Sequence, residues 1–344
     1  MTHLGVTGAE AWRDSRNGCC ARPIADRVMT RAAEPAVPGR GARPISYSRN
    51  DVVEPIHAHP GRHGTGQCHC LPDNTRELSC LLRRLHRDTN HQHSGHLIAG
   101  MVLLLAVCGW ILGGEEGARQ AVAAAAPPRD RWPLSPDVML RRLGARLLHP
   151  AETPALFEIL RTICRRARLA RLPSLYYLAH CPSMNAYALG GPDGSAIVFT
   201  EGLLHGMTLG EVGAILAHEV AHIHNNDNGA MTWAIRLHQA IAVTALAGLA
   251  LLPRNSWAGL LGAAPAIAQL LYLALSRIRE LDADAAALEW IDCPQDLVAA
   301  LHKLEHHHAG WHLTQASLEE GLRRFLRSHP ATWERVGILM RLGH

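Results

Sequence analysis

Three long runs of apolar residues stand out from the otherwise mixed pattern of this chain. Residues 97–114, 237–253 and 255–276 contain no Lys, Arg, Asp or Glu. A helix of about 18–20 apolar residues is long enough to cross the hydrocarbon core of a bilayer. A soluble pair of helices would carry charged outer faces, which the two later runs lack. We therefore predict a transmembrane helix at residues 95–115 and a transmembrane helical hairpin at 237–276.

The segments around these runs differ in amino-acid composition and in hydrophobic pattern. Residues 1–94 are rich in Arg, His, Pro and Gly without apolar periodicity, and we expect them to be disordered. Cys68, His69, Cys70 and Cys80 lie there, but without a second well-spaced pair we interpret them as chance clustering rather than a zinc site. Residues 131–236 and 277–344 have mixed patterns and should form the two parts of one domain outside the membrane.

The first of these parts contains both helical and strand-like patterns. Residues 154–171 have apolar positions at helical spacing, whereas 174–179 and 196–200 are short strand-like runs separated by a Gly-rich turn at 190–194. This pattern predicts an α+β fold that is mostly helical, with a small antiparallel sheet and added transmembrane helices.

Composition narrows the possible functions. The chain has 344 residues, 48% of them hydrophobic, and a net charge of +4. Lys303 is its only lysine among 34 basic residues. No sustained basic stripe is present, so we expect no nucleic-acid partner. The nine cysteines are scattered along the sequence, which is not typical of a secreted disulfide scaffold.

One segment carries a metal-binding motif. Thr208 and Glu211 form a capping box at the head of an apolar run, which predicts that a helix begins there. Inside this run lie His218, Glu219 and His222, an HExxH motif. Residues four apart share one helix face, so both imidazoles can bind the same tetrahedral zinc ion. The motif arises by chance in roughly 7% of chains with this His and Glu content, but chance does not also supply the capped helix.

A catalytic zinc ion needs a third protein ligand, and Glu280 is the candidate. It follows the last apolar run and can complete a His₂Glu set, as in thermolysin-like zinc peptidases. Asp284 lies one helical turn further, where its carboxylate can hold a ligand histidine by the other ring nitrogen. The alternative is an ordinary solvated run at the end of a membrane helix. If Glu280 is not the ligand, Asp227 or Asp282 is the next candidate.

Five segments together resemble the HtpX-type membrane zinc peptidases, the family that also includes the CAAX prenyl endopeptidases. They occur in family order over about residues 150–344 and comprise 185–190 (NAYALG), 197–204 (IVFTEGLL), 218–227 (HExxH followed by HNND), 276–284 (SRIRELDAD) and 328–330 (SHP) followed by Arg335. The sequence departs from the family pattern in two ways. It has a long N-terminal segment, and it has a single apolar span before the domain, where the family usually has two. Three spans also argue against prenyl-peptide processing, because the CAAX enzymes have about seven.

The resemblance implies a zincin-like catalytic domain that holds one zinc ion per chain on His218, His222 and Glu280. It implies that Glu219 is the general base and that His329 faces the cleft, where it would stabilise the oxyanion. It further implies that Asn185 and Ala186 lie at an edge strand that binds substrate backbone. Asn185 could instead cap its own turn, and the sequence leaves that alternative open.

The expected activity is endopeptidase cleavage of membrane or misfolded proteins, as in HtpX-type quality control. Glu280 follows the uncharged run closely, so the metal should lie near the membrane surface. We expect a multi-pass cell-membrane protein with protein substrates and lipid as its partners, and the resemblance implies a cytoplasmic catalytic domain. Two alternatives are a signalling membrane peptidase that cleaves one specific repressor and a non-catalytic zinc-binding scaffold. The intact Glu219 argues against the scaffold.

Overall fold

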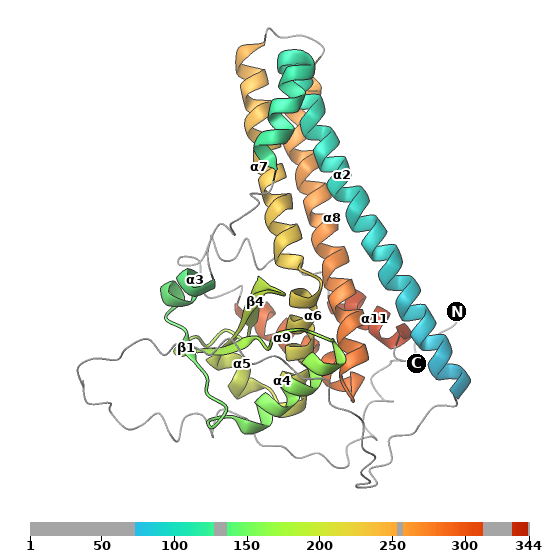
Figure 1. Cartoon of the computed structure of the whole chain (residues 1–344), viewed down its shortest axis with the longest axis vertical. Coiled ribbons are helices and arrows are strands. Elements are labelled where there is room, and N and C mark those ends of the chain that lie inside the picture. Colours follow the sequence, from blue (N-terminus) through green and yellow to red (C-terminus); the bar gives the residue numbers. More distant parts are fainter. Residues whose placement is uncertain (1–72, 127–135, 253–256, 312–331, 343–344) are drawn as a thin grey trace, which may run out of the picture.

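The computed structural model describes residues 73–126, 136–252, 257–311 and 332–342 of the chain. Helices dominate these residues, and three of the helices project together from a smaller mixed domain (Figure 1). In chain order the elements are α2 (Asp73–Ala125), α3 (Pro136–Leu143), β1 (Arg146–Leu147), α4 (Pro154–Arg166), β2 (Ser174–Leu178), β3 (Ala186–Gly191), β4 (Gly194–Thr200), α5 (Glu201–Gly206), α6 (Leu209–His224), α7 (Asp227–Leu251), α8 (Ala258–Trp290), α9 (Pro294–Trp311) and α11 (Thr332–Leu342).

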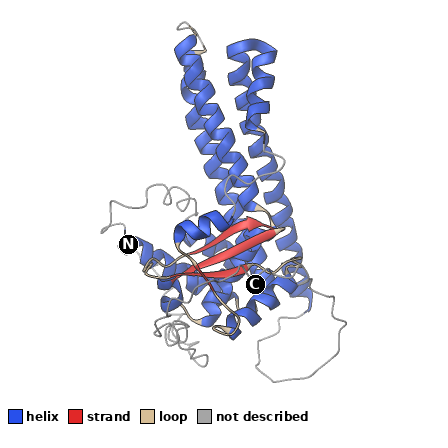
Figure 2. Cartoon of the chain, turned by 60° about the vertical axis from the view of Figure 1, so that its left-hand side comes forward, coloured by secondary structure: helices blue, strands red, loops and turns tan. Residues whose placement is uncertain are grey.

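The four strands form one mixed sheet in the order β1-β2-β4-β3, at the foot of the long helices (Figure 2). β3 and β4 are the antiparallel arms of a hairpin whose last pair is Gly191 with Gly194. β4, rather than β3, lies beside β2, so the β2–β4 pairing is parallel. The expected fold class, mostly helical with a small sheet, is confirmed, but the expectation of a wholly antiparallel sheet is wrong for this reason.

Two separate hydrophobic cores hold the molecule together. The first lies in the mixed domain, where α6 is almost entirely buried among α4, the sheet, α9 and the lower part of α8. The second lies between the long helices and includes Met101, Leu105, Ile241 and Ala268. Because α8 contributes to both cores, it ties the long helices rigidly to the domain that carries the HExxH motif.

The long helices are apolar on their outer faces as well as inside. Three helices, Leu81–Ala125, Asp227–Leu251 and Gly259–Trp290, are long and apolar enough to cross a membrane. Val243, Leu246 and Leu270 have 67%, 64% and 67% of their surface exposed. A helix that is apolar all round and still exposed is typical of a lipid environment.

The first long helix differs from the sequence expectation at both ends. It begins by Asp73, so residues 73–94, which we expected to be disordered, are helical. At Gly113 and Gly114 the backbone leaves helical geometry, and the chain turns back along itself (Figure 1). The returning arm ends beside α7, where the Trp233 indole donates a hydrogen bond to the Ala125 carbonyl at 3.2 Å.

Candidate metal centre

The HExxH segment lies on α6, and its start is fixed as the sequence predicts. The Thr208 hydroxyl accepts a hydrogen bond from the Glu211 amide, and the Glu211 carboxylate accepts one from the Thr208 amide at 2.7 Å, so the capping box is confirmed. Lys303 of α9 also binds the Glu211 carboxylate at 2.7 Å. This ion pair clamps the beginning of the metal-binding helix to α9.

Glu280 reaches the two histidines because α8 continues beyond its apolar part. α8 is one helix of 33 residues, and its lower half packs against α6. In the part of the chain that the structure describes, His218, His222 and Glu280 form the only group of three or more His, Cys, Asp or Glu side chains close enough to hold a metal ion. Their ligand atoms all lie within 4.8 Å of one another.

The spacing of these atoms fits a tetrahedral ion. The two Nε2 atoms are 3.0 Å apart, and Glu280 oxygens lie 3.4 Å from His218 Nε2 and 3.5 Å from His222 Nε2. Ligand atoms about 2.0–2.1 Å from a tetrahedral zinc ion are separated by about 3.3 Å. The three side chains therefore present a site of the size that zinc requires.

The Nδ1 atom of His218 faces a carboxylate. Asp284 lies 3.0 Å from it, and Arg335 of α11 binds both oxygens of Asp284 at 2.6 and 2.7 Å. This position suits the predicted role of Asp284, which is to hold a ligand histidine by its other ring nitrogen. Burial alone would lower the pKa of His218, but hydrogen bonds to Asp284 and Glu280 outweigh it and raise that pKa to about 10. The surroundings thus favour a positive charge at His218, which a metal ion would provide.

A second carboxylate faces the Nδ1 atom of His222, and we did not predict this role from the sequence. Asp227 lies 2.7 Å from the Nδ1 atom of His222 and accepts a hydrogen bond from Arg279 Nε at 2.5 Å. Asn226 has a left-handed conformation with φ of 53°, and this turn brings Asp227 back toward α6. Asp227 is three residues after the end of the motif-bearing helix, but the direction of its side chain depends on that turn.

The charges of this buried cluster also suit a divalent cation. The carboxylates beside the two Nδ1 atoms favour the tautomer with the proton on Nδ1, and when a metal ion displaces the Nε2 protons both Nε2 atoms, 3.0 Å apart, are free to bind it. Five buried carboxylates and two buried guanidiniums lie in this cluster, a balance of −5 + 2 = −3, and these are Glu219, Asp227, Glu280, Asp282, Asp284, Arg279 and Arg335. A doubly charged ion would offset most of this excess.

The predicted substrate edge lies beside the same helix. β3 is at the end of the described sheet order and packs against α6. Asn185 precedes it, and its Oδ1 atom accepts a hydrogen bond from the Ala186 amide at 2.9 Å. Asn228 of α7 donates hydrogen bonds to the Ala188 and Gly190 carbonyls, both at 3.0 Å. Sequence reasoning had not singled out Asn228, which ties the edge to the metal-bearing helices.

The predicted oxyanion donor and most of the cysteine cluster that we interpreted as chance lie outside the described residues. His329, the expected oxyanion donor, falls within 312–331, and the cluster of Cys68, His69 and Cys70 falls within 1–72. Cys80 is in the described part of α2.

A helix-borne HExxH pair and a carboxylate from a following helix, set at the foot of long apolar helices, define a membrane metallopeptidase. Residues 150–342 match the model of peptidase family M48, and the chain belongs to this family.

Individual relatives agree with this assignment. The chain is 30% identical over 272 residues to a protein described as Protease HtpX homolog from Methylibium petroleiphilum, covering 71% of this chain and 94% of that protein. It is also 30% identical to a Protease HtpX homolog from Acaryochloris marina, covering 67% and 87%. A solved structure, that of S. mikatae Ste24p, is 18% identical with a TM-score of 0.40, covering 77% of this chain and 66% of that chain.

Proposed function

We propose that this membrane metallopeptidase is a zinc-dependent endopeptidase that cleaves membrane or misfolded proteins, in the manner of HtpX-type quality control. The observation that carries the proposal is the convergence of His218, His222 and Glu280 at tetrahedral spacing. One zinc ion per chain would be held by these three residues. When bound, zinc supplies Lewis-acid polarisation of the scissile carbonyl and of a water molecule.

The remaining chemistry belongs to side chains of this protein. The carboxylate of Glu219, a residue that is 9% exposed, would accept a proton from the attacking water and return it to the leaving amine. Asp284 and Asp227 would keep the histidines in the tautomer that binds metal, since each faces an Nδ1 atom. From the sequence alone, His329 remains the candidate that stabilises the oxyanion.

The edge strand β3 is the proposed site for the substrate backbone. An extended peptide can add to such an edge through main-chain hydrogen bonds, which tolerate many sequences. Asn185 and Ala186 would align one substrate peptide group beside the metal. The support for this role is the position of β3 at the end of the sheet and against α6.

The proposed location is a multi-pass cell-membrane protein with the catalytic domain on the cytoplasmic side. Ser276 ends the uncharged run of α8, and Glu280 lies four residues later, about 6 Å along the helix. A metal centre at this depth would meet substrate segments as they emerge from the bilayer. This depth favours membrane proteins as substrates.

The decisive experiment compares wild type with Glu219→Gln as detergent-purified full-length protein. We expect zinc at about one per chain in both, because glutamine keeps the shape of the side chain. Cleavage of casein, or self-cleavage, should fall by at least about 10²-fold in the variant. Full activity in Glu219→Gln would exclude this mechanism. Zinc binding without cleavage in either protein would instead favour a non-catalytic scaffold.

A further inference from the structure

Asn228 binds the backbone of the candidate substrate strand from the first turn of α7. Its Nδ2 atom donates hydrogen bonds to two β3 carbonyls, those of Ala188 and Gly190, both at 3.0 Å. A side-chain amide has two N–H donors, so both are used on this one strand. The consequence for a substrate depends on which edge of β3 these carbonyls face.

The two carbonyls face the outer edge of the sheet. In an antiparallel pair, successive residues alternate between facing the partner strand and facing away from it. The Asn185 carbonyl accepts a hydrogen bond from the Thr200 amide of β4 at 3.1 Å, so residue 185 faces β4. Ala186, Ala188 and Gly190 therefore face away from β4, on the side where the described sheet has no further strand.

This outer edge has an open part and a closed part. In the described part of the chain, no hydrogen bond reaches the Ala186 carbonyl or the Ala188 amide on this side. An extended peptide can pair with these two groups. Further along the strand, Asn228 already binds the carbonyls of Ala188 and Gly190, and the start of α7 packs beside them. The surface available for strand pairing therefore ends at Ala188.

Two local features build the closed part. Gly190 has φ of 85°, which bends the strand so that carbonyls two residues apart reach one amide group. Just beyond it, a Cβ atom on Gly191 would lie 3.0 Å from the Oδ1 atom of Asn226, so the turn between α6 and α7 covers the end of the hairpin. The same turn places Asp227 beside His222. The amide that covers the strand and the carboxylate that supports a metal ligand are thus consecutive in the chain.

We propose that Asn228 sets the register of the bound substrate, an inference that rests on the proposed role of β3 as the substrate edge. Main-chain pairing tolerates many sequences, so side chains alone would not fix which peptide bond meets the metal. By ending the pairing surface at Ala188, Asn228 leaves a peptide one position on β3. Because Asp227 is the preceding residue, that position is fixed relative to His222. Asn228 is therefore a positioning residue, which contacts the substrate strand and not the reacting groups.

Removal of the amide should let the substrate slip by two residues. Side chains repeat every two residues along a strand, so a slip of two keeps each side chain on its own face, whereas a slip of one inverts them all. In Asn228→Ala the next obstacle is Asn226 beside Gly191, which limits the slip to a single step.

The cleavage sites in casein measure the register directly. Full-length wild type and Asn228→Ala digest casein briefly in detergent, and mass spectrometry maps the ends of the products. We expect sites displaced by two residues from a wild-type site to become about fivefold more frequent in the variant, the factor that one hydrogen bond typically contributes. Zinc content should be unchanged, because Asn228 contacts none of the three candidate ligands.

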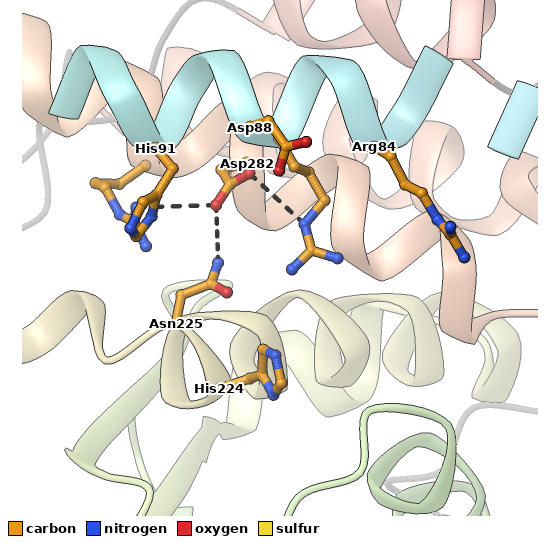
Figure 3. A pocket seen from close by; sticks show the side chains of 8 residues that line it. Arg84, Asp88, His91, His224, Asn225 and Asp282 are labelled. Atoms are coloured by element: carbon orange, nitrogen blue, oxygen red, sulfur yellow. Dashed lines mark hydrogen bonds and ion pairs between the residues drawn. The ribbon is translucent and has the colours of Figure 1, made fainter. Parts of the chain in front are cut away.

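Two further variants separate this role from a purely structural one. Asn228→Gln keeps the amide on a longer side chain and should give fewer displaced sites than Asn228→Ala. Asn225→Ala is the matched control, because the Asn225 amide donates to Asp282 of α8 at 3.1 Å and not to β3 (Figure 3). It should keep the wild-type sites even if its melting temperature falls as far as that of Asn228→Ala.

Hydrogen exchange tests binding separately from cleavage, in Glu219→Gln protein with zinc and a casein-derived peptide. The peptide should slow exchange of the Ala188 amide and leave that of Gly190 unchanged. With Asn228→Ala added, the protection should extend to Gly190. Protection of the Gly190 amide while Asn228 is present would overturn the proposal, even if Asn228→Ala does not fold.

The remaining outcomes distinguish this proposal from the proposed function. Identical cleavage sites in wild type and Asn228→Ala would overturn the register role and leave the endopeptidase intact. Protection that stops at Ala188, without cleavage by wild type, would support the register role and contradict the endopeptidase. A bound peptide that leaves β3 unprotected, or no binding of the peptide, would overturn the register role.

Discussion

At the scale of single residues, Glu280 and Asp284 should behave differently although they lie one turn apart on α8. Glu280 faces both Nε2 atoms, so Glu280→Ala should lose both zinc and activity. Asp284 contacts His218 at Nδ1 and not at the metal-binding Nε2 atom, so Asp284→Ala should weaken zinc affinity about 10–100-fold. Zinc content and competition with a chelator measure both effects. Stoichiometric zinc in Glu280→Ala would show that another residue is the third ligand.

Asn185 has two roles that substitution can separate. Its Oδ1 atom caps the Ala186 amide, whereas its amide nitrogen would be the donor to substrate. Asn185→Asp keeps the acceptor and removes the donors, so we expect kcat/KM to fall about tenfold or more with zinc content and melting temperature unchanged. Asn185→Ala removes both functions and should also lower stability by about 1 kcal/mol.

The comparison of these two variants decides the role of Asn185. If Asn185→Asp turns over substrate like wild type and Asn185→Ala is only less stable, the side chain does no more than cap its own turn. The substrate role would then be withdrawn, and the edge of β3 alone would be left to bind the peptide.

The residues that the sequence could predict are those linked by local geometry. His218 and His222 are four apart on one capped helix, and Glu280 and Asp284 repeat that spacing on another, so each pair shares a face whatever the tertiary structure. Asp227 and Arg279 escaped prediction because their contact depends on the left-handed turn at Asn226 and on how α8 packs against α6. Long-range pairing of this kind leaves no periodic signal in a single sequence.

At the scale of elements, the turn in α2 depends on small residues. A Cβ atom on Gly109 would lie 2.6 Å from the Gly117 carbonyl oxygen, and one on Gly117 would meet the Gly109 carbonyl. This close approach lets the returning arm pack on the first arm. The sequence predicted a single span here, because the uncharged run ends at Gly114 and a Glu-Glu/Ala-rich segment, which we interpreted as a linker, follows it.

Gly117→Ala should therefore destabilise the protein. The added methyl group forces the two arms apart, at a cost of about 1–3 kcal/mol. Gly95→Ala on the same helix is the control, because a Cβ atom there meets nothing within 4 Å. Alanine should stabilise that position slightly through its helix propensity. The melting temperatures of the two variants are compared in detergent. A Gly117→Ala variant that melts at the wild-type temperature would contradict the close packing of the two arms.

At the scale of the whole molecule, the turn in α2 changes the topology that the sequence suggested. A single first span would put residues 1–94 and the catalytic domain on opposite sides of the membrane. In the structure the chain turns back at Gly113–Gly114, and Arg87 lies near Asp282 and Glu289 of α8. The start of α2 and the metal centre are thus at the same end of the long helices, which allows both to face the cytoplasm.

Cysteine labelling in whole cells tests this orientation. Cys293 is exposed in the catalytic domain, whereas Glu115 is exposed at the opposite end of the long helices, just after the turn (Figure 1). With the other eight of the nine cysteines replaced, Cys293 should resist a membrane-impermeant maleimide until the cells are permeabilised. Glu115→Cys, in a chain without the native cysteines, should be labelled in intact cells because it would lie outside.

Labelling of Cys293 in intact cells, with Glu115→Cys protected, would place the catalytic domain outside the cytoplasm. Labelling of both or neither before permeabilisation would contradict a membrane-crossing arrangement of these helices.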